Sequence, residues 1–88
     1  MRWHIELSRH ASTFITVNHI SKEHVFSLIA DAIRNFQGEI ISFDIRKMKG
    51  GWEGFYRIRK GKWRAIVEFD FNKHSVFIED IDWRGNIY

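Results

Sequence analysis

The sequence predicts an α+β fold in which a strand and two N-terminal helices precede a three-stranded antiparallel meander. Three observations carry this prediction: helical apolar spacing early in the chain, alternation of apolar and polar residues late in it, and turn residues between the late segments. Segregation of helices from hairpin-linked strands is typical of α+β proteins. The 88 residues, 44% of them hydrophobic and none of them cysteine, predict a single domain over residues 1–88 with a core that needs no disulfides.

The first half of the chain is expected to supply one strand and both helices. Residues 3–7 alternate with Trp3, Ile5 and Leu7 on one side, as in a half-buried strand. Ser8 can cap a short helix over residues 9–17, whose inward residues are Ala11, Phe14 and Ile15.

A longer helix is predicted over residues 22–37. Ser21 is suited to the N-cap, and Gly38 to the left-handed position that follows a helix. The apolar face of this helix repeats with helical spacing and consists of Val25, Leu28, Ile29, Ala32, Ile33 and Phe36.

The second half is expected to form the meander. Residues 40–45 indicate an extended stretch that leads into a basic segment, and the glycine-rich residues 48–54 indicate a loop. Strands are predicted over 55–60, 62–71 and 75–82, with turns at Gly61 and at 72–74.

The positive charge is concentrated in residues 46–64. This segment holds eight Lys or Arg residues and one acid, Glu53, a balance of +7 that leaves −4 for the rest of a chain whose net charge is +3. Clustered cations favour a polyanionic partner such as a nucleic acid. A solvated loop and strand face is the alternative interpretation.

Strand alternation shows which cations of the basic segment lie together, which composition alone does not. Arg57 and Arg59 share one strand face, and a hairpin at Gly61 brings Arg64 beside them. Guanidinium groups gathered on a sheet offer planar, bidentate donors to phosphate. We therefore expect a phosphate-binding surface on this sheet.

Several other chemistries have no support in the sequence. There is no glycine-rich nucleotide loop, no His-Glu-x-x-His motif and no cysteine, and the five histidines lack metal-ligand spacing. We expect no cofactor, no metal site and no site role for the histidines. Asp80 and Asp82 can share a face as paired carboxylates, or they can simply balance the basic surface.

The C-terminal half resembles the RelE/ParE toxin superfamily. The resemblance lies in Lys47-Met48-Lys49-Gly50, in residues 54–67 (GFYRIRKGKWRAIV) and in residues 82–88 (DWRGNIY). The corresponding superfamily patterns are L-K-G, Y-R-I-R-x-G-x-Y-R-I-I-Y and a closing H-R-x-x-V-Y. Residues 45–88 carry the match, and the N-terminal elements agree in order and length. The resemblance implies a small curved sheet packed on two helices.

The resemblance further implies the toxin of a type II toxin–antitoxin pair. RelE-like members cleave mRNA in the ribosomal A site, and the matching residues favour this activity, a metal-independent endoribonuclease in contact with mRNA and 16S rRNA. The implied partner is an acidic antitoxin, and the implied location is the cytoplasm, without membrane association. The alternatives are a ParE-like inhibitor of DNA gyrase that acts by protein binding, and a plain nucleic-acid-binding module or inactive toxin.

The resemblance also implies roles for individual residues. Arg64 and Arg84 match positions that stabilise phosphate and protonate the leaving group, and Tyr88 matches a substrate-orienting tyrosine. Arg57 and Arg59 stand where known nucleases carry lysines, and Trp83 stands where the pattern has histidine. The remaining cations expected to bind RNA phosphates are Lys47, Lys49, Lys60 and Lys62.

The arginines leave the general base unassigned, because a guanidinium with a pKa above about 12 is rarely neutral. A lysine whose neutral form is favoured by neighbouring cations, namely Lys47, Lys49 or Lys62, is one candidate. The carboxylate at the chain end, on Tyr88, is a second candidate to act beside the site.

Three aromatic residues lie close to the cations. Phe55 and Trp63 occupy strand positions that favour the core, whereas Trp52, in the glycine-flanked loop, is equally suited to stacking on an RNA base.

Overall fold

The structure, a computed structural model, describes residues 3–40 and 43–83. The elements in these ranges are β1 (His4–Leu7), α1 (Arg9–Val17), α2 (Lys22–Phe36), β2 (Asp44–Lys47), β3 (Phe55–Lys60), β4 (Trp63–Asp70) and β5 (Ser75–Trp83). Both helices, the first strand and the three late strands are confirmed to within one residue at each end. Neither described helix is long and apolar enough to cross a membrane.

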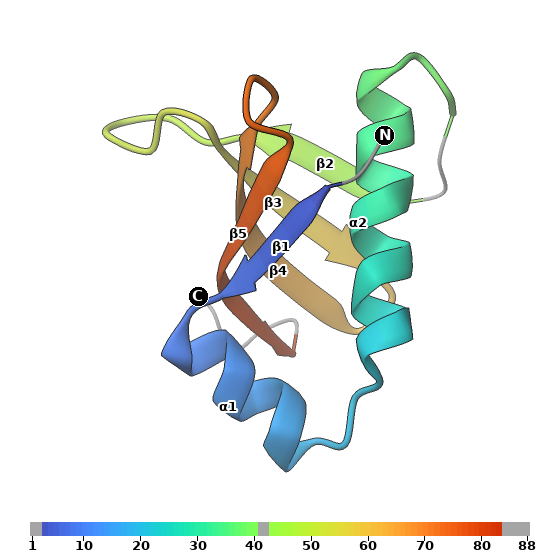
Figure 1. Cartoon of the computed structure of the whole chain (residues 1–88), viewed down its shortest axis with the longest axis vertical. Coiled ribbons are helices and arrows are strands. Elements are labelled where there is room, and N and C mark those ends of the chain that lie inside the picture. Colours follow the sequence, from blue (N-terminus) through green and yellow to red (C-terminus); the bar gives the residue numbers. More distant parts are fainter. Residues whose placement is uncertain (1–2, 41–42, 84–88) are drawn as a thin grey trace.

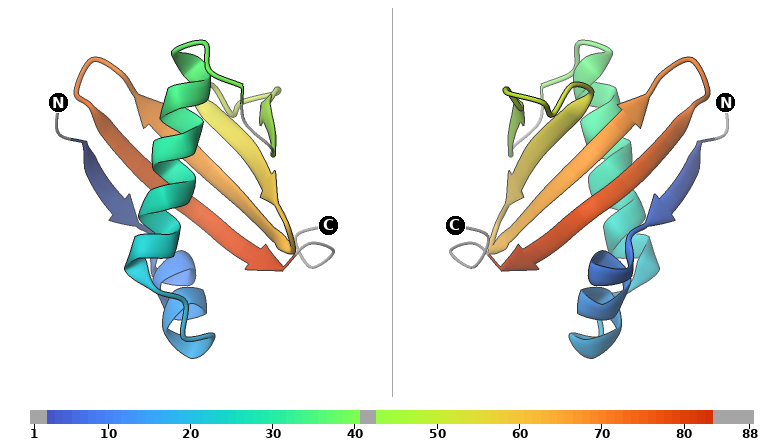
Figure 2. Two further views of the ribbon diagram at one scale, coloured as in Figure 1. Left: turned by 90° about the vertical axis from the view of Figure 1, so that its right-hand side faces the viewer. Right: turned by 90° about the vertical axis from the view of Figure 1, so that its left-hand side faces the viewer.

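The sheet is larger than the sequence predicts. It has five strands in the order β1-β5-β4-β3-β2 (Figure 2), and four of them follow the helices, so the prediction of a three-stranded meander is wrong. β1 runs parallel to β5 at one edge, and the other neighbouring strands are antiparallel. The sheet is therefore mixed.

The strand that the prediction omits is β2. Its residues Asp44–Lys47 pair with β3, with Asp44 opposite Arg59 and Arg46 opposite Arg57. The extended stretch predicted over residues 40–45 overlaps its start, and Phe43 and Ile45 pack against the core, but three of the four residues of β2 are charged. It becomes a strand because β3 supplies its hydrogen-bonding partners, a nonlocal effect that strand propensity does not capture.

One face of the sheet is covered by α2 (Figure 1). The predicted apolar face of α2 is confirmed, with Leu28, Ile29 and Ala32 essentially inaccessible to solvent. On the sheet, the same core contains Ile58, Ala65, Val67, Phe69, Val76, Ile78 and Ile81. Phe36 is only partly buried and closes one end of this core by edge contacts with Tyr56 and Phe69.

The start of α1 is tied directly to β5. The Ser8 hydroxyl accepts a hydrogen bond from the Ala11 N–H at 3.0 Å and donates one to the Glu79 carbonyl at 2.6 Å. The Ser8 N–H donates to the Ile78 carbonyl at 2.9 Å. The predicted cap is confirmed, and it also fixes the first turn of α1 against the sheet.

β5 contains a bulge at Glu79. Ile78 pairs with Val67 and Asp80 pairs with Ile66, so Glu79 has no Cα partner on β4. An extra residue reverses the alternation of side chains along a strand. Ile78 and Ile81 therefore both face the core, and Asp80 and Asp82 face the opposite side of the sheet.

Candidate functional site

The face of the sheet away from α2, here called the open face, is turned toward the viewer in the right panel of Figure 2. Cross-strand partners point to the same side of a sheet, so the pairing register defines which side chains lie together there. One line of partners crosses four strands and consists of Asp44, Arg59, Arg64 and Asp82. We call it the arginine row. The adjacent line consists of Arg46, Arg57, Ile66 and Asp80.

The three arginines predicted to meet on the sheet are brought together in this register. Arg59 is directly opposite Arg64, and Arg57 is one position along the same face of β3. Arg64 is buried, with 6% of its surface exposed. The buried Nε of Arg59 has no hydrogen-bond acceptor among the described residues. A buried donor without an acceptor is uncommon in proteins, and an anionic oxygen on this face would provide one.

Acidic residues stand at both ends of the arginine row. Asp44 is opposite Arg59 on the β2 side, and Asp82 is opposite Arg64 on the β5 side. This arrangement agrees with the interpretation that the late acidic run balances the basic surface. It also keeps Arg59 and Arg64 from forming an uncompensated pair of like charges in a partly buried position.

A second group of cations lies beside the row, at the β2–β3 edge. A cavity of about 220 Å³ is lined by Arg46, Lys47, Met48, Lys49 and Arg57. We call it the cationic hollow. Arg46, Lys47 and Lys49 are exposed, and Arg46 makes a contact of 3.4 Å with Asp44. Arg57 belongs to both the hollow and the open face, so it joins the two groups.

Two of the predicted phosphate-binding lysines lie apart from these groups. Lys60 shares the helix side of β3 with Ile58, and its Nζ is 3.7 Å from Asp31 Oδ2 on α2 and 5.4 Å from the centre of the Phe43 ring. Lys62 is exposed in the turn between β3 and β4. Strand alternation already places Lys60 with Tyr56 and Ile58 rather than with the arginines.

Arg84 and Tyr88, together with the carboxylate of Tyr88, lie outside the described residues. Trp83, which precedes them, is partly exposed and packs edge-on against Phe14 of α1, with ring centres 5.3 Å apart.

The three aromatic residues near the cations are distributed over both faces. Trp63 faces α2 and packs against His24, with ring centres 4.6 Å apart. Phe55 shares the open face with Arg57 and is in edge contact with Trp52, which is 39% exposed. Trp52 therefore has free ring surface close to the cationic hollow.

The sequence analysis missed a contact between α1 and β5. His10 Nε2 lies 2.8 Å from Asp80 Oδ1 and 4.0 Å from Asp82 Oδ2. The sequence signal for this contact is the spacing of Ile78 and Ile81. Two apolar residues three positions apart share one strand face only if a bulge lies between them, and that bulge turns Asp80 and Asp82 to the other face. Within the described ranges, no group of three or more His, Asp or Glu side chains could hold a metal ion.

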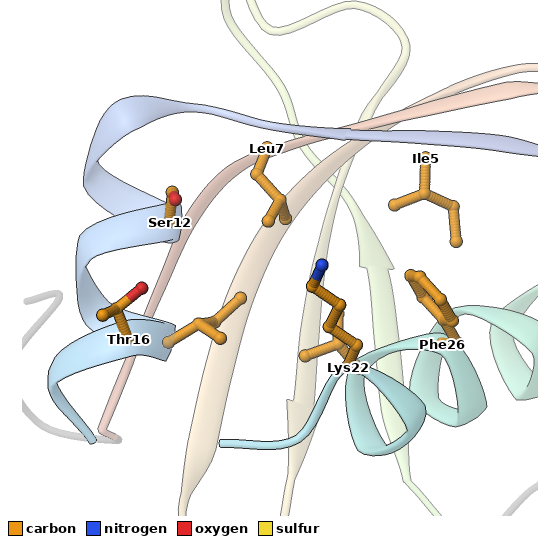
Figure 3. Close-up of a pocket in the computed structure, with 8 residues that line it drawn as sticks. Ile5, Leu7, Ser12, Thr16, Lys22 and Phe26 are labelled. Carbon is orange, nitrogen blue, oxygen red and sulfur yellow. The ribbon is translucent and has the colours of Figure 1, made fainter. Parts of the chain in front are cut away.

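A further cavity of about 220 Å³ lies away from the open face, between β1, α1 and α2. In Figure 3, Ile5 and Leu7 of β1 point toward Lys22 and Phe26 of α2. Leu7 and Phe26 are among the exposed large hydrophobic residues of the chain. The cavity is therefore mainly apolar, with the amine of Lys22 and the hydroxyls of Ser12 and Thr16 at its wall.

The fold is shared with several toxins of solved structure. The chain aligns with YafQ in the DinJ–YafQ toxin–antitoxin complex of Escherichia coli at a TM-score of 0.71 and 15% identity, covering 100% of this chain and 99% of that one. A metal-bound toxin from Helicobacter pylori gives a TM-score of 0.69 at 13% identity, with 99% and 100% covered.

The RelB–RelE antitoxin–toxin complex of Methanococcus jannaschii gives a TM-score of 0.58 at 21% identity, with 94% of each chain covered. No protein-family model and no curated protein sequence matches the chain. These alignments establish a shared fold, and they confirm the fold that the sequence resemblance implies.

Proposed function

We propose that this chain is the toxin of a type II toxin–antitoxin pair and that it acts as an endoribonuclease on mRNA held in the ribosomal A site. The observation that carries the proposal is the arginine row on the open face of a RelE-type fold. Arg57, Arg59 and Arg64 come from two adjacent strands and lie on the side that no described helix covers. These three guanidinium groups place several hydrogen-bond donors close together, as binding of one phosphate group requires.

The chemistry of RNA cleavage explains why such donors are useful. When the ribose 2′-oxygen attacks the adjacent phosphorus, negative charge accumulates on the phosphorane oxygens. Donors held in place before the reaction stabilise this charge without reorganising. Arg64, buried and opposite Asp82, is the arginine best held for this role. Arg59 Nε has no acceptor within residues 3–40 and 43–83, and a phosphate oxygen can supply one.

The exposed cations serve binding in this proposal. Arg46, Lys47 and Lys49 line a hollow that adjoins Arg57, so they can hold the RNA backbone on one side of the scissile phosphate. Exposed cations contribute mainly through the release of counterions from the phosphate backbone. Arg84 and Tyr88 remain proposed contributors to leaving-group protonation and substrate orientation, on the resemblance alone.

The proposed partner is an acidic antitoxin that places a helix over the toxin. Charge complementarity with the basic segment and with Lys22 favours an acidic partner, and the apolar cavity beside Leu7 and Phe26 offers surface for an amphipathic helix. We expect that an acidic protein is encoded next to this chain and that its co-expression prevents growth arrest. Replacing Phe26 with Glu should weaken that protection.

The function is tested by brief induction in a bacterial host, followed by mapping of the 5′ ends of cellular RNA. The proposal predicts growth arrest with new 5′ ends inside translated reading frames, and loss of both effects in the Arg64→Ala/Arg84→Ala double variant. Retained toxicity in that variant contradicts the nuclease. Arrest accompanied by DNA damage and intact mRNA indicates a gyrase inhibitor, and absence of arrest indicates a binding module or an inactive toxin.

A further inference from the structure

The arginines of the arginine row cannot accept a proton, and its two carboxylates, Asp44 and Asp82, stand opposite them as counter-charges. Attack by the 2′-oxygen on phosphorus requires that the 2′-hydroxyl lose its proton, and guanidinium groups are donors only. The two lysines of the cationic hollow stand at the opposite end of the row from β5, and Lys62 stands in the β3–β4 turn. A proton acceptor is therefore needed from another element.

The β5 end of the row is occupied by an imidazole. His10 lies in the first turn of α1 and contacts both Asp80 and Asp82, and Asp82 is directly opposite Arg64. His10 Nε2 lies 2.8 Å from Asp80 Oδ1, without the alignment of a hydrogen bond, and a proton carried on Nε2 would be attracted to this carboxylate. The Nδ1 lone pair is then the one that can accept a proton.

The bulge in β5 and the Ser8 hydroxyl together bring the His10 imidazole to the arginine row. The bulge at Glu79 turns Asp80 and Asp82 to the open face, and Ser8 joins the start of α1 to the Glu79 carbonyl. His10 follows Ser8 by two residues, so the same hydroxyl that caps α1 fixes the approach of the ring to Asp80. Bulges beside active sites often redirect side chains in this way.

Space for a ligand adjoins His10. A cavity of about 190 Å³ is lined by His10, Thr13, Phe14, Val17, Asn18 and Asp82. It runs between α1 and the end of β5, and Asp82 connects it to Arg64. A phosphate on the arginines can therefore have its ribose beside the imidazole.

We propose that His10 accepts the proton of the attacking ribose 2′-hydroxyl and that Asp80 is the residue that positions its ring. This inference rests on the proposed function. The 2′-oxygen forms a bond to phosphorus, the bond from phosphorus to the 5′-oxygen breaks, and the 2′-hydroxyl proton passes to His10. The departing 5′-oxygen takes a proton from water, a step that the proposed role of Arg84 assists, and the imidazolium later returns its proton to water. The products are a 2′,3′-cyclic phosphate and a 5′-hydroxyl.

The chain contains a matched control. His4 is also on the open face and also contacts a carboxylate, Glu6, at 3.1 Å. It stands opposite Ser75 in β5, at the end of β1 that is remote from α1 and the arginine row. If the loss of any exposed histidine that contacts a carboxylate slowed cleavage, His4→Gln would slow it as well.

The experiment measures single-turnover cleavage of mRNA on programmed ribosomes by the full chain. His10→Gln is expected to slow cleavage by about 100-fold, since a positioned acid–base group contributes at least that much, and His4→Gln to leave the rate unchanged. Asp80→Asn should give a smaller loss. Added imidazole should restore His10→Ala in a concentration-dependent way, an effect that a role limited to anchoring α1 does not produce.

The pH dependence provides a second readout. The charged groups that face His10 among the described residues are Asp80 and Asp82 of β5, with Arg64 of β4 beyond Asp82. A rate that depends on one proton-accepting side chain should change with pH in the wild-type chain, and His10→Gln should lose that part of the pH dependence.

The outcomes separate this inference from the function on which it rests. Cleavage by His10→Gln at the wild-type rate, with an unchanged pH profile, overturns the role of His10 and leaves the nuclease intact. A slow His10→Ala that imidazole does not restore also overturns it, in favour of an anchoring role. Absence of cleavage by the wild-type chain overturns both proposals.

Discussion

The arginine row and the cationic hollow are both basic, yet they differ in burial and in charge compensation. Arg64 is buried and faces Asp82 across the strands, whereas Arg46, Lys47 and Lys49 are exposed at the edge of the sheet. Fixed, partly desolvated donors act strongly on charge that develops nearby, and exposed cations act at longer range and are screened by salt. Under the proposed function, this difference favours a chemical role for the arginine row and an RNA-binding role for the cationic hollow.

Removal of Arg64 should have the largest effect. Arg64→Ala is expected to lower the rate of mRNA cleavage at saturating toxin by at least about 100-fold, as for loss of one preorganised donor in other enzymes. Arg64→Lys keeps the charge but loses the planar, bidentate geometry, so its rate should be intermediate. Single-turnover kinetics measure both, with thermal unfolding to verify that each variant is folded. Cleavage at the wild-type rate by a folded Arg64→Ala variant would contradict the proposed chemical role of the arginine row.

Removal of the exposed cations should have a smaller effect of a different kind. In Arg46→Ala/Lys49→Ala, the toxin concentration for half-maximal cleavage should rise by about tenfold at low salt, and its dependence on salt should become shallower because two phosphate contacts are lost. The saturating rate should stay close to wild type. A titration of toxin at several salt concentrations tests this, and a fall in the saturating rate without a change in the half-maximal concentration contradicts the division between the two regions.

The smallest effect is expected at Lys60, which belongs to neither region in the structure. Lys60→Ala removes a contact with Asp31 and one with the Phe43 ring. The free energy of unfolding should fall by about 0.5 kcal/mol, as for partly exposed ion pairs, with little change in cleavage. Denaturant unfolding and the cleavage assay measure the two quantities. A large loss of cleavage in a stable Lys60→Ala variant would return Lys60 to the RNA-binding set.

The sequence predicts the elements that depend on local pattern. The apolar spacing of α2, the Ser8 cap and the hairpin at Gly61 are visible in the chain, and the hairpin is sufficient to bring Arg57, Arg59 and Arg64 to one face. These features are set by residues close together in sequence, so pattern alone recovers them.

The features that escaped prediction depend on contacts between distant segments. β2 becomes a strand through its pairing with β3, and Asp80 reaches the open face because Glu79 forms a bulge. The contact of His10 with Asp80 joins residues 70 positions apart, and it follows from the placement of α1 against β5. No local pattern around His10 distinguishes it from the other histidines.

The proposed attack by the ribose 2′-hydroxyl on the open face can be tested on the RNA itself. Ribosomes are programmed with mRNA carrying a single 2′-deoxy nucleotide at the mapped cleavage position, and cleavage by the wild-type chain is compared with that of the unmodified mRNA. If the 2′-hydroxyl is the nucleophile, the unmodified mRNA gives a 2′,3′-cyclic phosphate end and the deoxy position is not cleaved. Cleavage of the deoxy mRNA at the same position and at an unchanged rate would contradict the proposed attack.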